Sequence, residues 1–114
     1  MSRLHDFAIR DSATMKEAIE LIQRNNSRCV IVIGVEGKVV GVFSEGDVLR
    51  AILKGVDVHA PLRALIKPSF RYLKERDIAA ARKLIVAGIT LVPIIDPDFR
   101  LVDVLTLSDV LAAD

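Results

Sequence analysis

Two short motifs in the sequence pair a hydroxyl with a carboxylate three residues later, Ser44-x-x-Asp47 and Thr106-x-x-Asp109. This spacing is typical of a helix N-terminus, where the hydroxyl caps the backbone and the acid completes the cap. Each motif directly follows an apolar segment, at the corner between a strand and a helix. The spacing alone favours capping, whereas the repeated position at such a corner favours a binding site.

Two further residues help to weigh these interpretations. Thr14 and Glu17 have the same spacing at an ordinary helix start, so they serve as an internal comparison. Gly41 lies three residues before Ser44, and the absence of a side chain there leaves room for a flat ligand against the strand.

The remaining reactive side chains do not form a recognisable catalytic group. His5 and His59 lie far apart in segments that we expect to be exposed, and neither has a carboxylate at metal-ligand spacing. Cys29 opens an apolar strand, which predicts a buried structural thiol. No glycine-rich loop opens onto a helix after a strand, so neither a dinucleotide fingerprint nor a phosphate loop is present. The sequence predicts no catalytic residue, no metal site and no enzyme.

Length and composition limit the class of protein. The 114 residues suit one compact domain, and 52% apolar with 27% charged residues predicts a globular chain. A formal charge of +1 and 4% aromatic residues argue against nucleic-acid binding. No apolar run approaches the roughly 18–20 residues of a membrane helix, and the N-terminus lacks the apolar region of a secretory signal. With a single cysteine, these features predict a cytoplasmic protein.

The chain contains an internal repeat at an offset of 62 residues, which relates residues 47–49 (DVL) to residues 109–111 (DVL). Matches without gaps extend this relation over most of the chain, as with Val30 and Val92 or Ile33 and Ile95. We expect one repeat over about 7–54, a linker over about 55–67 and a second repeat over about 68–114. Because a half of this size is too small to bury a good core alone, the halves should pack on each other.

Each half is expected to have the order β-α-β-β-α. The first half should contain a strand at 7–9, a helix from Thr14, a hairpin over 29–33 and 39–43, and a helix from 44 to about 53. The second should contain a strand at 70–73, a helix over about 76–87, a hairpin over 91–95 and 101–105, and a last helix. Residues 59–66 are expected to form a short helix between the halves.

Residues 41–49 (GVFSEGDVL) resemble the signature corner of a CBS domain, the cystathionine β-synthase domain, and residues 88–109 (GITLVPIIDPDFRLVDVLTLSD) resemble it more fully. The resemblance covers about residues 7–113. It implies that the whole chain, 1–114, is a single Bateman module. Its α/β (α+β) fold would contain two CBS repeats that pack about a pseudo-two-fold axis. Many members of the family bind AMP, ATP or S-adenosylmethionine in the two clefts between the repeats.

The resemblance also implies roles for individual residues. The acid of each motif accepts hydrogen bonds from ribose hydroxyls, which suits an acceptor-only carboxylate, and the hydroxyl contacts ribose or phosphate. Aliphatic side chains, and Phe70 in the second half, would line the space for the base, although each also fits a core position. Arg28 stands where a phosphate contact is common, although a solvated strand edge fits it as well, and Thr90 is its uncharged equivalent. The expected ligand-binding residues are Ser44, Asp47, Thr106, Asp109, Gly41, Arg28, Ile9, Ile31, Thr90 and Pro93.

The second half departs from the family pattern. Asp103 stands where the first half has Gly41, and a carboxylate there would crowd the cleft and repel a phosphate. We therefore expect at least one cleft to be empty or to prefer a less anionic ligand, such as a nucleoside or an adenosyl sulfonium compound. Asp77 replaces the apolar Met15, which predicts less regular packing in the second half.

Two functions follow as hypotheses. The first is a regulatory module that senses an adenosine-containing ligand and modulates a fused or partner protein. Residues 53–61 (LKGVDVHAP) resemble modules fused to sugar-phosphate nucleotidyltransferases, which makes such an enzyme one possible partner. The second is a ligand-free dimerisation or scaffold domain, because family modules commonly form homodimers. The helix residues that would supply its apolar surface are Ile19, Ile22, Leu49, Ile52, Leu53, Leu84 and Leu111.

Overall fold

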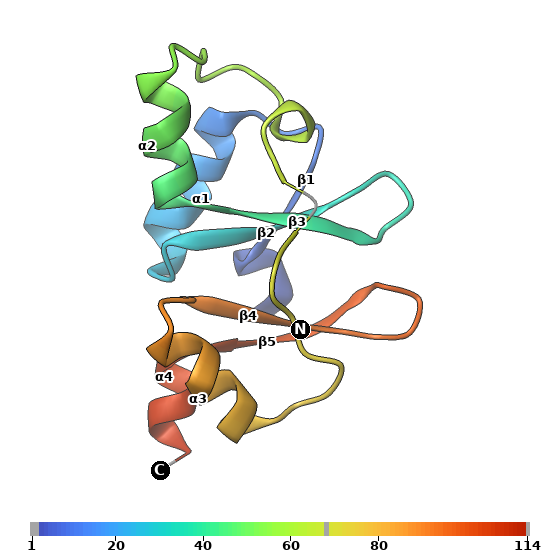
Figure 1. Cartoon of the computed structure of the whole chain (residues 1–114). Helices are drawn as coiled ribbons and strands as arrows, with labels where there is room; N and C mark the ends of the chain where they lie inside the picture. The colour runs from blue at the N-terminus through green and yellow to red at the C-terminus, as the bar shows by residue number, and fades with distance from the viewer. Residues whose placement is uncertain (1–2, 68, 114) are drawn as a thin grey trace.

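The computed structural model describes residues 3–67 and 69–113, which form two halves whose strands face one another in the middle of the molecule (Figure 1). Two short 3-10 helices, η1 (Arg3–Asp6) and η2 (Leu62–Ala64), accompany the strands and α-helices. The other elements are β1 (Ala8–Arg10), α1 (Met15–Asn25), β2 (Cys29–Ile33), β3 (Val39–Ser44), α2 (Glu45–Leu53), α3 (Ile78–Val86), β4 (Leu91–Ile95), β5 (Leu101–Thr106) and α4 (Leu107–Ala112). The mixed α/β class expected from the sequence is confirmed.

The strand pairing of the two sheets reflects the internal repeat. In the first half β1 pairs in parallel with β2, and β2 pairs antiparallel with β3. In the second half β4 pairs antiparallel with β5. Both hairpins carry a register shift at the same point, between residues 32 and 33 and between residues 94 and 95. These positions differ by the repeat offset, so the two hairpins have the same local geometry.

The expected strand at 70–73 is wrong. Leu73 forms only an isolated bridge, in which its N–H donates to the Pro93 carbonyl at 2.9 Å and its carbonyl accepts from Ile95 at 2.9 Å. In the first half, the N–H of Ile31 donates to Phe7 at 2.7 Å and begins the ladder between β1 and β2. Pro93 occupies the position equivalent to Ile31 and has no N–H to donate. The second half therefore lacks the hydrogen bond with which its first strand would start.

Three helices begin at the hydroxyl residues expected to cap them, because Thr14, Ser44 and Thr106 cap α1, α2 and α4 through their side chains. The helix expected over about 76–87 is α3, which Asp77 caps, a role that was not predicted for this residue from the sequence. The predicted helix at 59–66 shortens to η2, and η1 has no counterpart in the sequence prediction.

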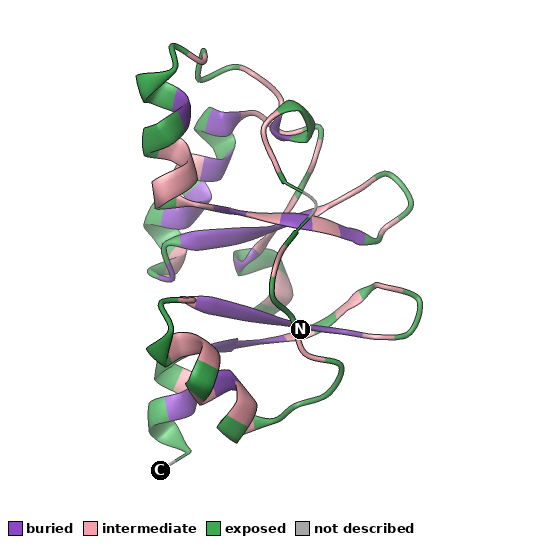
Figure 2. Cartoon of the chain, in the orientation of Figure 1, coloured by how far each residue is buried: buried purple, intermediate pink, exposed green. Residues whose placement is uncertain are grey.

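The core has three parts, and the middle one joins the halves. Val30 and Val32 of β2 pack toward α1, whereas Ile31 lies in a cluster with Leu91, Ile95 and other residues of both halves. Successive side chains of a strand point to opposite faces, so a strand that is buried on both faces reads as a continuous apolar run. Figure 2 shows the strands buried between exposed outer helix faces. This arrangement confirms that the halves pack on each other.

The linker is packed against the first half. Leu62 is fully buried in the core beside α1, and its N–H donates to the Ala13 carbonyl at 2.8 Å. The N–H of Met15 donates to Ala60 at 2.9 Å. These contacts fix the course of residues 64–67, which then cross β3 at Gly41 (Figure 1).

Candidate functional site

The two hydroxyl-carboxylate motifs form the same capping geometry. Oδ2 of Asp47 accepts from the N–H of Ser44 at 2.9 Å and from its hydroxyl at 3.0 Å. Oδ2 of Asp109 accepts from the N–H of Thr106 at 2.8 Å and from its hydroxyl at 3.0 Å. In both motifs the hydroxyl oxygen accepts from the backbone N–H of the acid at 3.2 Å. Capping therefore uses one carboxylate oxygen and leaves Oδ1 outside the box.

The internal comparison behaves in the same way. The N–H of Thr14 donates to Oε1 of Glu17 at 3.0 Å, and the N–H of Glu17 donates to the Thr14 hydroxyl at 3.2 Å. The capping box is thus common to three helix starts. What distinguishes the two candidate corners is the surroundings of the carboxylate.

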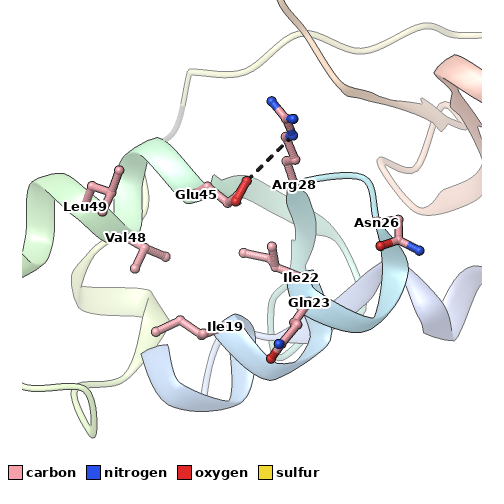
Figure 3. Close-up of a pocket in the computed structure, with 8 residues that line it drawn as sticks. All are labelled: Ile19, Ile22, Gln23, Asn26, Arg28, Glu45, Val48 and Leu49. Atoms are coloured by element: carbon pink, nitrogen blue, oxygen red, sulfur yellow. Dashed lines mark ion pairs between the residues drawn. The ribbon is translucent and has the colours of Figure 1, made fainter.

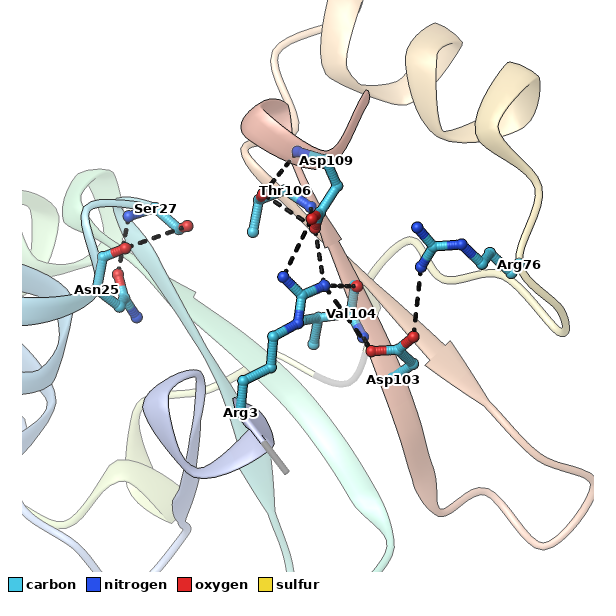
Figure 4. A network of polar contacts seen from close by, with 8 residues as sticks. All are labelled: Arg3, Asn25, Ser27, Arg76, Asp103, Val104, Thr106 and Asp109. Atoms are coloured by element: carbon cyan, nitrogen blue, oxygen red, sulfur yellow. Dashed lines mark hydrogen bonds and ion pairs between the residues drawn. The ribbon is translucent and has the colours of Figure 1, made fainter. Parts of the chain in front are cut away.

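At the second corner, made by Thr106, Asp109 and Asp103, the guanidinium of Arg3 occupies the space beside the carboxylate (Figure 4). Its Nη1 donates to Oδ1 of Asp109 at 3.1 Å, and its Nη2 donates to Oδ2 at 2.8 Å. Nη2 also donates to the Val104 carbonyl at 2.6 Å. Both oxygens of Asp109 are therefore engaged by residues of the chain itself.

Asp103 belongs to the same network. One of its oxygens lies 3.9 Å from Nη2 of Arg3, and the other accepts from Arg76 at 3.4 Å. The hydrogen bond from Arg3, opposed by partial burial and aided by the bonds from Thr106, lowers the pKa of Asp109 to about 2. The same bond raises the pKa of Arg3. The second corner is therefore a connected group of two carboxylates and two arginines.

The first corner borders an open groove of about 270 Å³ between α2 and the linker. The groove, here called the Asp47 groove, is lined by Phe43, Asp47, Arg50, Ala51, Lys54, Val56, Ala64, Leu65 and Lys67. Nη2 of Arg50 donates to Oδ1 of Asp47 at 2.7 Å, from a side chain that is 60% exposed. Burial tends to raise the pKa of Asp47, but hydrogen bonds from Ser44 and Arg50 hold it below its usual value.

The Asp47 groove carries an excess of positive charge. Three cationic side chains accompany its single carboxylate. Within residues 3–67 and 69–113, neither Lys54 nor Lys67 forms an ion pair. Apolar walls from Val56 and Leu65 face the same space. The groove thus combines an acceptor, free ammonium groups and apolar surface.

Gly41 has a different role from the one predicted. A Cβ at this position would lie 3.1 Å from the Lys67 carbonyl oxygen and 3.4 Å from Cβ of Ile66. The space over the glycine is therefore filled by the linker, so it does not hold a flat ligand. The absent side chain allows the linker to approach β3 closely and so places Lys67 at the groove.

Four other residues predicted to bind a ligand lie away from the Asp47 groove. Ile31 and Pro93 are fully buried and belong to the core, so neither presents surface to a ligand. Ile9 is half-buried and lines a shallow hollow of about 300 Å³ beside the β2–β3 hairpin. Thr90 is half-buried just before β4. None of these four lines the Asp47 groove.

Arg28 lies in another groove, the α1–α2 groove, which has a volume of about 560 Å³ (Figure 3). Its Nε is 3.8 Å from Oε1 of Glu45, and its side chain is 75% exposed. Ile19, Val48 and Leu49 provide apolar walls to this groove. The expected phosphate contact and the expected ribose acceptor therefore line different surfaces.

Several residues at the two corners were not found from the sequence, namely Arg3, Arg50, Lys54, Leu65, Lys67 and Arg76. The repeat offset carries a signal for one pair, because Leu65 stands 62 residues after Arg3. Each of the two precedes its half. Arg3 donates to Asp109, and Leu65 lines the same groove as Asp47. Continuing the repeat upstream of residue 7 would have paired them.

Other kinds of site find no support. Among the described residues, no group of three or more histidine, cysteine, aspartate or glutamate side chains is arranged to hold a metal ion. Within residues 3–67 and 69–113, no helix has the length and apolar character needed to cross a membrane. Cys29 is buried, as expected, and burial raises the pKa of its thiol to about 12.

Comparison with known proteins places this geometry in a family context. Residues 1–54 match the CBS domain family. An uncharacterized protein of Helicobacter pylori is 32% identical over 106 residues, which make up 90% of this chain and 32% of that protein. The chain thus spans about a third of the length of the curated relative that it matches.

Solved structures share the fold over almost the whole chain. A CBS domain pair/ACT domain protein from Thermotoga maritima is 25% identical, with a TM-score of 0.75 over 94% of this chain and 86% of that chain. A CBS domain protein from Pyrobaculum aerophilum, solved in complex with AMP, is 24% identical, with a TM-score of 0.72 over 90% of this chain and 81% of that chain.

Proposed function

We propose that the chain is a regulatory module that senses an adenosine-containing nucleotide. The premise is that residues 1–54 match the CBS domain family and that the whole chain has the fold of a CBS domain pair. The observation that carries the proposal is the Asp47 groove, where a carboxylate lies among unpaired lysines and apolar walls. The AMP complex of the Pyrobaculum aerophilum protein supports this choice of ligand.

The groove offers a partner for each part of such a ligand. Oδ1 of Asp47 accepts from the ribose hydroxyls once Arg50, whose side chain is largely exposed, moves aside. Lys54 and Lys67 then lie beside the phosphates as unpaired cations, together with the released Arg50. Val56 and Leu65 provide apolar contact for the base.

Regulation follows from the two walls of the groove. One wall is α2 of the first half, and the other is the linker that leads to the second half. A ligand that contacts both walls binds more tightly when the walls lie close together than when they lie apart. This difference in affinity between the two arrangements is what shifts the equilibrium between them. A fused or associated enzyme, such as a sugar-phosphate nucleotidyltransferase, would respond to the shift in the cytoplasm.

Isothermal titration calorimetry with AMP, ADP, ATP, adenosine and S-adenosylmethionine tests the proposal. The lysines predict tighter binding of AMP, ADP and ATP than of uncharged adenosine. At 100 times its dissociation constant, a ligand that binds only the folded chain should stabilise it by about 2.7 kcal/mol. Absence of heat and of thermal stabilisation across the whole panel would overturn the proposed function.

A second candidate function is dimerisation through the helices. Leu49, Ile52 and Leu53 of α2 are 62%, 49% and 86% exposed, and Leu111 of α4 is 61% exposed. Leu49 is also part of the apolar wall of the α1–α2 groove. A second copy of the chain would cover these exposed side chains.

Sedimentation equilibrium on the wild type and on L49E/L53E tests this second function. Dimerisation through these helices predicts a wild-type dimer that L49E/L53E converts to monomer. V35E is the control, because Val35 is 85% exposed on a hairpin away from the helices. A wild type that stays monomeric, or a dimer that survives L49E/L53E, would exclude this function.

A further inference from the structure

The two corners are built from equivalent segments but are filled differently. Leu65, in the segment that precedes the second half, lines the Asp47 groove of the first half. Arg3, its equivalent at the repeat offset, precedes the first half and reaches Asp109 in the second. The repeat thus places a leucine at one corner and an arginine at the other.

From this difference we infer that Arg3 closes the second corner, so that the chain takes one nucleotide, in the Asp47 groove. The inference rests on the proposed function and assigns to Arg3 the stoichiometry of binding. An adenosine ligand at this corner would need the oxygens that Arg3 already holds.

The contacts of Arg3 explain why it closes the corner. Its guanidinium donates to both oxygens of Asp109, at 3.1 and 2.8 Å, and to the Val104 carbonyl at 2.6 Å (Figure 4). It also lies 5.9 Å from the centre of the Phe7 ring. Donation to a carboxylate by two nitrogens fixes the orientation of the group as well as its position. At the first corner, by contrast, Arg50 makes one such bond and is largely exposed.

The charges at the second corner also disfavour displacement of Arg3 by a phosphate. Arg3 and Arg76 together balance Asp103 and Asp109. Removal of Arg3 leaves two carboxylates with one arginine, which repel an anionic ligand. An opened second corner should therefore accept uncharged adenosine more readily than AMP.

The test is equilibrium dialysis of radiolabelled adenosine and AMP against the wild type, R3A, R3K and R3A/D109A. The R10A variant is the matched control, because Arg10 is an exposed arginine of the same N-terminal region with no ion pair in the described structure. Circular dichroism confirms that each variant is folded at the temperature of dialysis. R3K keeps the positive charge but lacks the planar fork, so it should open the corner in part.

The expected result is one ligand per chain for the wild type and R10A, and two adenosines per chain for R3A, with the second lost again in R3A/D109A. Two ligands per wild-type chain, or one per chain for both the wild type and R3A, would show that Arg3 does not set the stoichiometry while leaving the proposed function intact. If the wild type binds none and R3A binds one at Asp109, Arg3 closes the corner but the Asp47 groove is not a site. If neither binds, both proposals fail.

Discussion

The guanidinium of Arg3 lies 2.8 Å from Oδ2 of Asp109, although the two residues are 106 positions apart in the sequence. Through this contact the segment before β1, in the first half, is tied to the start of α4, in the second half. The contact therefore crosses the boundary between the halves. It joins them by a charged pair at the edge of the apolar middle cluster, which contains Phe7 and Val104.

The first prediction concerns the pH dependence of the Arg3–Asp109 ion pair. R3A should lower the free energy of unfolding by about 1 kcal/mol at neutral pH, a value suited to a partly exposed pair with two-nitrogen geometry. In the folded chain the pKa of Asp109 is about 2, below its ordinary value of 3.8. A depressed pKa gives stability that is present above pH 4 and is lost as the pH falls toward 2.

Urea unfolding of the wild type and R3A at several pH values between 2 and 7 measures this effect. The difference between them should be constant above about pH 5 and should be mostly lost by pH 2. R10A, which removes an arginine without an ion pair, should show no such pH dependence. An R3A deficit that stays the same down to pH 2 would mean that the guanidinium does not act through the carboxylate of Asp109.

The second prediction concerns Cys29. The thiol is 6% exposed and burial raises its pKa to about 12, so it is both inaccessible and un-ionised in the folded chain at pH 8. Reaction with a thiol reagent should then follow unfolding, and a nucleotide that stabilises the folded chain should slow it. Labelling is measured with Ellman's reagent over a urea series. Complete reaction within seconds in native buffer would contradict the burial.

The sequence allowed the prediction of most of the fold because local chemistry decides it. Thr14, Ser44 and Thr106 were expected to cap helices and do so, since a hydroxyl and an acid three residues later satisfy the first backbone donors. Both hairpins were expected as well, with ends within one residue of those observed. The strand at 70–73 failed because its pairing depends on an N–H that Pro93 lacks, which only the three-dimensional pairing makes evident.

The site was harder to predict than the fold. Ile31 and Pro93 were expected to line a cleft, but a β-branched or cyclic apolar side chain on a strand fits a core equally well, and both are buried. Lys67 and Arg3 each lie beside an acid that is distant in the sequence, Asp47 and Asp109 respectively. Their positions depend on the path of the linker and of η1. A motif can fix a carboxylate, whereas the charges around it come from segments whose paths no local pattern reveals.

The third prediction concerns the charge of the Asp47 groove. K54M/K67M removes two ammonium groups and keeps much of the aliphatic length, so the affinity for AMP should fall by about tenfold or more while the affinity for adenosine changes little. Calorimetric titration of both ligands gives the comparison. K16M is the control, because Lys16 is an exposed lysine outside the groove. Equal losses for AMP and adenosine would show that the lysines do not face the phosphate.

The fourth prediction concerns Gly41. G41A places a Cβ 3.1 Å from the Lys67 carbonyl, so the linker must move and the chain should lose about 1–2 kcal/mol of stability. G46A is the control, because its Cβ would meet only the flexible end of Arg50, at 3.3 Å. Alanine should be neutral or slightly stabilising there, within α2. Chemical denaturation of both variants measures the difference, and equal stability of G41A and G46A would show that the linker does not depend on this glycine.

The most direct test of the account is nucleotide binding by D47A beside E17A. Both substitutions remove the acid of a capping box, so each should cost about 1 kcal/mol of stability, but only Asp47 borders the groove. Calorimetric titration with AMP should show that E17A binds as the wild type does, whereas D47A loses at least about tenfold in affinity, as expected for hydrogen bonds to a charged acceptor. Equal binding of AMP by D47A, E17A and the wild type would contradict the assignment of the site.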